Sequence, residues 1–162
     1  MGNNLGYSFL NVYAKFKLHF YRKIFRRFES REASLSAVET FCVEVIYALG
    51  APTVGEFASF IDISQANAAY KIQSLARKGY VAKVRSEDDR REYHLHVTEK
   101  FLEYNRLNTN YVETVVQRIE KRFSPAEVKS FKQMLDVISN ELMTEMPNRI
   151  QVSLLSQDTC GS

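Results

Sequence analysis

Apolar residues recur at helical spacing along most of the chain, and the first such stretch covers residues 7 to 29. Its apolar side chains are Phe9, Leu10, Tyr13, Ala14, Phe16, Leu18, Phe20, Tyr21, Ile24, Phe25 and Phe28. The stripe predicts a long helix, and it is wider than an isolated surface helix needs. We therefore favour burial of this helix between subunits. Lys15, Arg22 and Arg26 on the opposite edge leave a membrane-surface helix as the alternative.

Three further helix starts share one pattern, in which Ser or Thr is followed three residues later by Glu. They are Ser36-x-x-Glu39, Thr53-x-x-Glu56 and Ser124-x-x-Glu127. This is the capping box, in which the hydroxyl accepts one free helix N–H and the Glu accepts another. The first box predicts a helix that ends at Gly50, and the second predicts a short helix that stops at residues 62–63.

Ser64 then begins another helix, which closes at Lys78-Gly79 and buries Ala68, Ile72 and Leu75. Two helices separated by so short a break fit a helix-turn-helix, although an ordinary helical corner has the same pattern. The next segment favours the first interpretation. Residues 80–85 and 93–97 are β-rich runs joined by the charged SEDDRRE, which predicts a hairpin directly after the helix pair. This order is that of a winged helix.

Two long apolar helices complete the pattern, one from residue 98 to 123 and one from Ser124-Pro125 to about residue 142. The expected fold is mainly α with a small β-hairpin: a winged helix-turn-helix at residues 36–97, flanked by helices at 7–29 and 98–146. Residues 147–162 have no sustained periodicity and are expected to form a loose tail. The 162 residues, of which 45% are hydrophobic, suit one domain.

Charge is distributed unevenly, although the net charge is only +3. Residues 7–29 carry six Lys or Arg against one acid, and residues 64–97 carry seven against four. A local basic surface suits nucleic acid, an anionic membrane or simple solubility. No apolar run approaches the roughly 18 residues of a membrane span. Cys42 and Cys160 do not suggest a disulfide framework, so we expect a cytoplasmic protein.

Two stretches resemble the MarR family of transcriptional regulators. DDRREYHLHVTEK, residues 88–100, is similar to the family's wing, with Asp89 and Arg91 as its Asp-x-Arg pair. ISQANAAYKIQSLARKGYV, residues 63–81, is similar to its recognition helix. The resemblance covers about residues 7–146 and implies a homodimer, joined by its first and last helices, that reads a palindromic operator. It also implies a repressor released by a small-molecule effector or by oxidation. Asp62 and Phe101 stand where the family usually has Gly.

In such a fold, side chains of the recognition helix read base edges, while cations neutralise phosphates. Gln65 and Asn67 suit bidentate pairing with adenine, and Tyr70 and Lys71 suit backbone or methyl contacts. Ser64 is expected mainly to cap the helix. The predicted DNA-binding set is Ser64, Gln65, Asn67, Ala68, Tyr70, Lys71, Asp89, Arg90 and Arg91. At the wing tip Arg90 or Arg91 would enter a minor groove, with Asp89 placed to orient Arg91.

Catalysis has little support, because the six glycines are scattered and no phosphate-binding loop or nucleophile motif is present. We therefore expect no enzyme, cofactor or metal. His94 and His96 could ligate a metal, but solvent-facing positions or phosphate contacts suit them better. His19 is a candidate lining residue for an effector pocket, and Cys42 is expected in the core. The alternative function is a winged-helix module that binds a protein or a membrane surface and not DNA.

Overall fold

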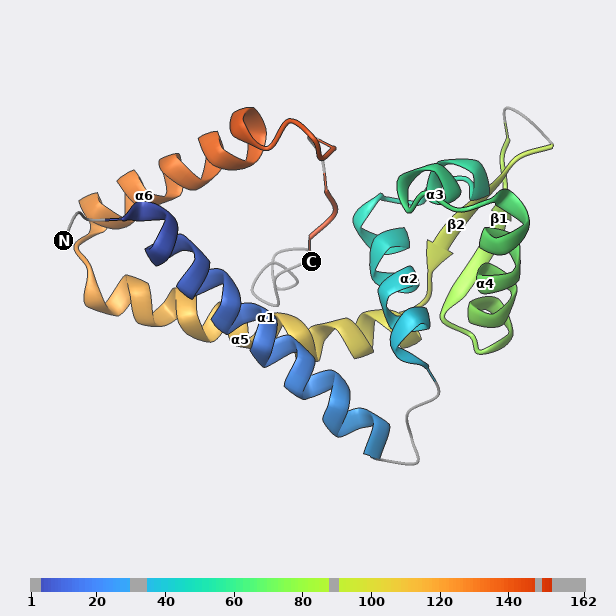
Figure 1. Cartoon of the computed structure of the whole chain (residues 1–162), viewed down its shortest axis with the longest axis horizontal. Helices are drawn as coiled ribbons and strands as arrows, with labels where there is room; N and C mark the ends of the chain where they lie inside the picture. The colour runs from blue at the N-terminus through green and yellow to red at the C-terminus, as the bar shows by residue number, and fades with distance from the viewer. Residues whose placement is uncertain (1–3, 30–34, 88–90, 148–149, 153–162) are drawn as a thin grey trace, which may run out of the picture.

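The computed structural model describes residues 4–29, 35–87, 91–147 and 150–152. Its elements are α1 (Leu5–Glu29), α2 (Ala37–Ala48), α3 (Val54–Phe60), α4 (Gln65–Arg77), β1 (Val81–Arg85), β2 (Tyr93–Val97), α5 (Glu99–Arg122), α6 (Pro125–Val137) and a π-helical turn, η1 (Ile138–Leu142). Figure 1 shows α2, α3, α4 and the hairpin gathered in one unit, with α1, α5 and α6 forming an open frame beside it. The predicted fold class is confirmed.

All three predicted capping boxes are present. At the start of α2, Glu39 N–H donates to Ser36 Oγ at 3.2 Å, and Ser36 N–H donates to the Glu39 carboxylate at 2.7 Å. The same reciprocal pair begins α3 at Thr53 and α6 at Ser124. A cap of this kind contributes about 1 kcal/mol to the helix that it begins. Local sequence therefore fixes where these helices start.

The core lies between α2, α3, α4, the hairpin and the first turn of α5. Its fully buried side chains include Val43, Ile46, Phe57, Ala68, Ile72, Leu75, Leu95 and Phe101. The predicted burial of Ala68, Ile72 and Leu75 is confirmed, and Cys42 is buried as expected. Phe101 replaces a family Gly without conflict, because its ring fills the core at 5.4 Å from the Tyr47 ring centroid.

The frame is much less buried than the core. The α1 helix crosses α5 where Phe16 and His19 meet Tyr111, with ring centroids 5.5 and 3.8 Å apart. No residue of α6 or η1 is buried. None of the described helices combines the length and the apolar character that crossing a membrane requires. Large apolar areas of the frame are therefore exposed in the single chain.

We expected residues 147–162 to form a loose tail, and most of them lie outside the described residues. In the described part, Gln151 N–H donates to Ala48 C=O, at the end of α2, at 2.8 Å. Pro147 and Ile150 line a hollow with residues of α2 and α3. The described part of the tail is therefore held against the winged-helix unit. Periodicity could not predict this contact because it depends on one backbone hydrogen bond to a distant segment.

Candidate nucleic-acid interface

The turn between α3 and α4 positions the predicted recognition helix. Ile63 N–H donates to Ala58 C=O at 3.0 Å, and Asp62 has φ +54°. This is the geometry of a left-handed helix end, which Gly usually occupies and Asp tolerates. Ser64 then caps α4 by accepting Asn67 N–H at 3.2 Å. The local capping role expected for Ser64 is confirmed.

The α4 helix separates a buried face from an exposed one. Ala68, Ile72 and Leu75 have no exposed surface, whereas Gln65, Asn67 and Tyr70 are exposed, Tyr70 to 74%. Lys71 is half-buried. The burial of Ala68 corrects its inclusion in the predicted DNA-contact set, because its methyl group points into the core. The other α4 residues of that set form a polar surface on the first turns of the helix.

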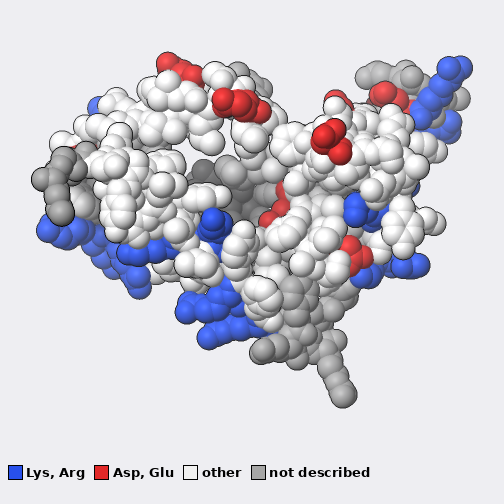
Figure 2. Space-filling model, viewed as in Figure 1, with Lys and Arg blue, Asp and Glu red and all other residues white. Residues whose placement is uncertain are grey.

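The wing is the antiparallel pair of β1 and β2, with Val81 opposite Val97 and Arg85 opposite Tyr93. Ser86 N–H extends the pairing by donating to Glu92 C=O at 3.0 Å. Arg91 is exposed in the turn. Figure 1 shows the hairpin projecting from the body, and Figure 2 shows basic side chains near its end. Asp89 and Arg90 lie outside the described residues, so the predicted pairing of Asp89 with Arg91 stays a prediction.

The base of the wing is fixed to the turn before α3. Leu95 N–H donates to Pro52 C=O at 2.9 Å, and Thr53 forms an isolated antiparallel bridge with His94. His94 Nδ1 lies 3.0 Å from Ala51 C=O, so this nitrogen carries the proton. The expectation that His94 faces solvent is wrong, because it is half-buried against this turn. His96, its neighbour on the same strand face, is exposed.

A partly buried ionic contact sets α4 against α2. Besides capping α2, the Glu39 carboxylate accepts Ser74 Oγ–H at 2.7 Å and lies 2.7 Å from Lys78 Nζ. Burial by itself would raise the pKa of Glu39, but the hydrogen bonds from Lys78, Ser36 and Ser74 outweigh it and lower the pKa to about 2. Glu39 is therefore ionised at neutral pH and joins the start of one helix to the end of the other.

The C-terminal end of α4 is joined to α5. Gly79 has φ +79°, which ends the helix, and its carbonyl accepts the Thr98 hydroxyl at 2.7 Å. Lys100 Nζ donates to Lys78 C=O at 2.9 Å and lies 4.5 Å from the Tyr80 ring centroid. Thr98 begins α5 as predicted, although its hydroxyl bonds to Gly79 and does not cap its own helix. The recognition helix is therefore held at both ends.

Further cations and polar groups lie on the wing. Lys83, Arg85 and His96 are exposed along the hairpin and are missing from the predicted contact set. Charged residues that interrupt an otherwise apolar strand were the sequence signal that could have identified them. The described His, Cys, Asp and Glu side chains include no group of three that could hold a metal ion. The surface as a whole offers polar donors on a helix beside a basic hairpin.

The chain has a helix-turn-helix whose second helix, α4, is exposed at its N-terminal turns. A hairpin follows and pairs with the turn before α3. This arrangement defines a winged-helix protein. Residues 35–93 match the model of the MarR family, so this segment of the chain is similar to a MarR-family domain. The match covers α2, α3, α4 and β1 and ends at Tyr93, the first residue of β2. It also contains most of the residues that carry the resemblance seen in the sequence.

Solved structures extend the similarity of fold to the frame. A mutant of MepR from a multidrug-resistant S. aureus clinical isolate has a TM-score of 0.64 at 14% identity, covering 88% of this chain and 100% of that chain. The regulator Tm0710 from Thermotoga maritima has a TM-score of 0.62 at 19% identity, covering 90% and 100%. Streptococcus pneumoniae FabT, solved in complex with DNA, has a TM-score of 0.53 at 24% identity, covering 86% and 99%. No curated protein matches the chain.

Proposed function

We propose that the chain is a transcriptional regulator that binds double-stranded DNA in a sequence-specific manner. The observation that carries the proposal is the division of α4, which buries one face completely and exposes Gln65, Asn67 and Tyr70 on the other. An amide side chain on the first turn of such a helix can pair with adenine in the major groove. In this proposal Arg91, which is exposed on the wing, enters a neighbouring minor groove. FabT, which shares this fold, was solved with DNA bound.

The regulator acts as a homodimer in this proposal. Large apolar side chains of the frame are exposed in the single chain, including Leu10 at 63%, Phe25 at 69% and Met134 at 60%. A soluble chain rarely leaves so much apolar surface in water, so a partner is expected to cover it. A second copy suits best, because a two-fold axis would place two α4 helices on one face for a palindromic site. The frame is therefore the proposed dimer interface.

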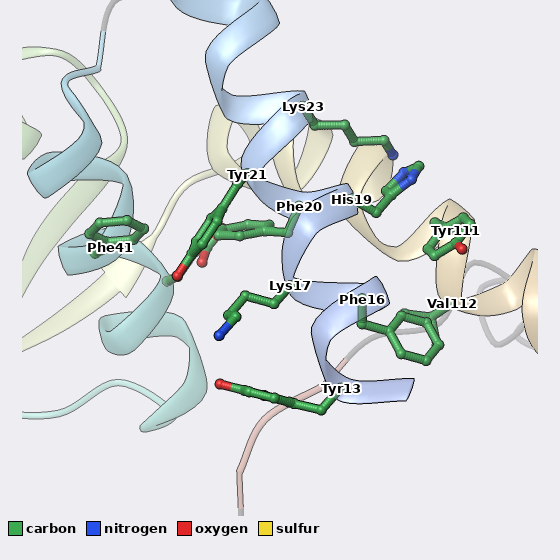
Figure 3. Close-up of a pocket in the computed structure, with 11 residues that line it drawn as sticks. Tyr13, Phe16, Lys17, His19, Phe20, Tyr21, Lys23, Phe41, Tyr111 and Val112 are labelled. Carbon is green, nitrogen blue, oxygen red and sulfur yellow. The ribbon is translucent and has the colours of Figure 1, made fainter. Parts of the chain in front are cut away.

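A small-molecule effector would act through the pocket of Figure 3. This cavity of about 460 Å³ is lined from α1, α2 and α5, mainly by aromatic rings: Tyr13, Phe16, Phe20, Tyr21, Phe41 and Tyr111. His19, the residue predicted for such a pocket, stacks on Tyr111 at 3.8 Å. Because the pocket lies between the frame and α2 of the winged-helix unit, an effector that binds better at one angle between them than at another would shift that angle. In this proposal the shift releases the repressor from DNA.

The test begins with selection of bound fragments from a random duplex pool by the full chain. With the selected duplex, Asn67→Ala and Arg91→Ala should each weaken binding about tenfold, since a base contact contributes roughly 1–3 kcal/mol. Gln73→Ala and Arg77→Ala are matched controls, since both residues lie on the second half of α4 and neither is buried. Affinity should also fall steeply with salt. Failure to enrich any duplex would instead favour a winged-helix module with a protein partner.

A further inference from the structure

We propose that the tail residues Pro147, Ile150 and Gln151 form a strap that fixes the orientation of the winged-helix unit relative to the frame. The tail follows η1 and therefore belongs to the α6 side of the frame. Its described end reaches the C-terminal end of α2, in the winged-helix unit. The consequence for DNA binding rests on the proposed function, but the docking itself does not.

The strap is held by one backbone hydrogen bond and by apolar contact. Gln151 N–H donates to Ala48 C=O at 2.8 Å. This carbonyl is among the last of α2, where a helix leaves its C=O groups without partners in the helix itself. The bond therefore satisfies an acceptor that water or another segment would otherwise have to satisfy, and it does so from a residue distant in sequence.

The apolar part of the contact is a hollow of about 310 Å³ between α2, α3 and the tail. Pro147 and Ile150 line it from the tail, and Phe41, Val45, Ala48, Leu49 and Phe60 line it from the winged-helix unit, together with Glu44. Phe41 and Phe60 remain 45% and 42% exposed and Ile150 46%, so the contact is shallow. A shallow contact with one hydrogen bond suits a reversible strap better than a permanent part of the core.

The strap adds a connection between the two parts of the molecule. The chain already joins them where β2 is followed directly by α5 and where α1 is followed by α2, and α1 and α2 also line one pocket. A further attachment at the end of α2 restricts rotation of the winged-helix unit relative to the frame. In the proposed dimer this rotation sets the separation of the two α4 helices. If only a fraction of the dimers holds the two α4 helices at the right separation, the apparent affinity for DNA falls by that fraction. A strap that fixes the separation avoids this loss.

Fluorescence can test the docking without DNA, because the chain contains no Trp. Phe60→Trp places a single reporter beside the hollow, at a position exposed enough to accept an indole. In that background Ile150→Asp should shift the emission to longer wavelength and raise acrylamide quenching about twofold. Val152→Asp is the matched control, since Val152 is in the same tail but 76% exposed and not part of the hollow.

The docking is overturned if Ile150→Asp and Val152→Asp give the same spectrum. The two spectra should also still differ when the protein is diluted until it is monomeric. If they become the same on dilution, the tail docks on a second copy and the contact is not intramolecular. With the selected duplex, Ile150→Asp should weaken binding about three- to tenfold. If the fluorescence shows docking but Ile150→Asp binds the duplex as tightly as the unaltered chain, or more tightly, the orienting role is rejected. If the unaltered chain binds no duplex, the proposed function fails while the fluorescence result still stands.

Discussion

Glu39 offers the sharpest test of how the recognition helix is held. Replacing it by Gln keeps the size of the side chain but removes the charge that faces Lys78. The pKa of Glu39 is lowered from 4.5 to about 2, and each pKa unit corresponds to about 1.36 kcal/mol, so the upper limit is roughly 3 kcal/mol. Glu39 and Lys78 side chains are 14% and 29% exposed, so solvent screens the pair. We expect Glu39→Gln to lower the free energy of unfolding by about 1–2 kcal/mol at pH 7.

The contribution of Glu39 to the free energy of unfolding depends on pH. A carboxylate whose pKa is lower in the folded state stabilises that state above its unfolded pKa of 4.5, and this contribution is lost as pH falls toward 2. Urea unfolding followed by circular dichroism, at one protein concentration, should show the wild type and Glu39→Gln converging between pH 4.5 and 2. Glu56→Gln is the control, because it alters the capping box of α3 but has no ion-pair partner among the described residues. A Glu39→Gln deficit that stays constant down to pH 2 would refute the reasoning.

Three further outcomes follow from the same structure. Ala51 has φ +64°, so Ala51→Gly should stabilise the fold by up to about 1 kcal/mol and raise Tm by a few degrees in a thermal scan, and a lower Tm would contradict this. Burial raises the pKa of the Cys42 thiol, so a thiol reagent should modify it only as the protein unfolds; rapid modification of the native protein, with Cys160 replaced by Ser, would show otherwise. Leu95→Ala should lower the free energy of unfolding by about 2–5 kcal/mol in urea, because Leu95 is fully buried, and a loss below about 1 kcal/mol would argue against that packing.

Local chemistry explains what the sequence could predict. The capping boxes at Ser36, Thr53 and Ser124 depend on residues three positions apart, so the sequence predicts each helix start. The same holds for the helix end at Gly79. In each case the residues that decide the structure are neighbours in the chain. The family resemblance added the expected homodimer, its palindromic operator and the Asp89–Arg91 pair at the wing tip.

Contacts between distant segments were the part that could not be predicted. The bond from Leu95 to Pro52 joins the wing to a turn far earlier in the chain, and it explains why His94 is half-buried and not exposed on the wing. Glu39 reads as a capping residue only, and its contact with Lys78 depends on the angle at which α2 and α4 pack. The tail contact with Ala48 has the same origin. Such pairs follow from three-dimensional packing and leave no periodic signal.

The division of α4 into a buried face and an exposed one has an evolutionary consequence. Gln65, Asn67 and Tyr70 can be exchanged without disturbing the packing of Ala68 and Ile72. Surface substitutions of this kind usually change stability by less than about 0.5 kcal/mol. In the proposed function, duplicated copies of such a gene can therefore diverge in the DNA they recognise while keeping the same scaffold. The same separation would make this helix a convenient place to redirect the proposed binding to a chosen DNA sequence by design.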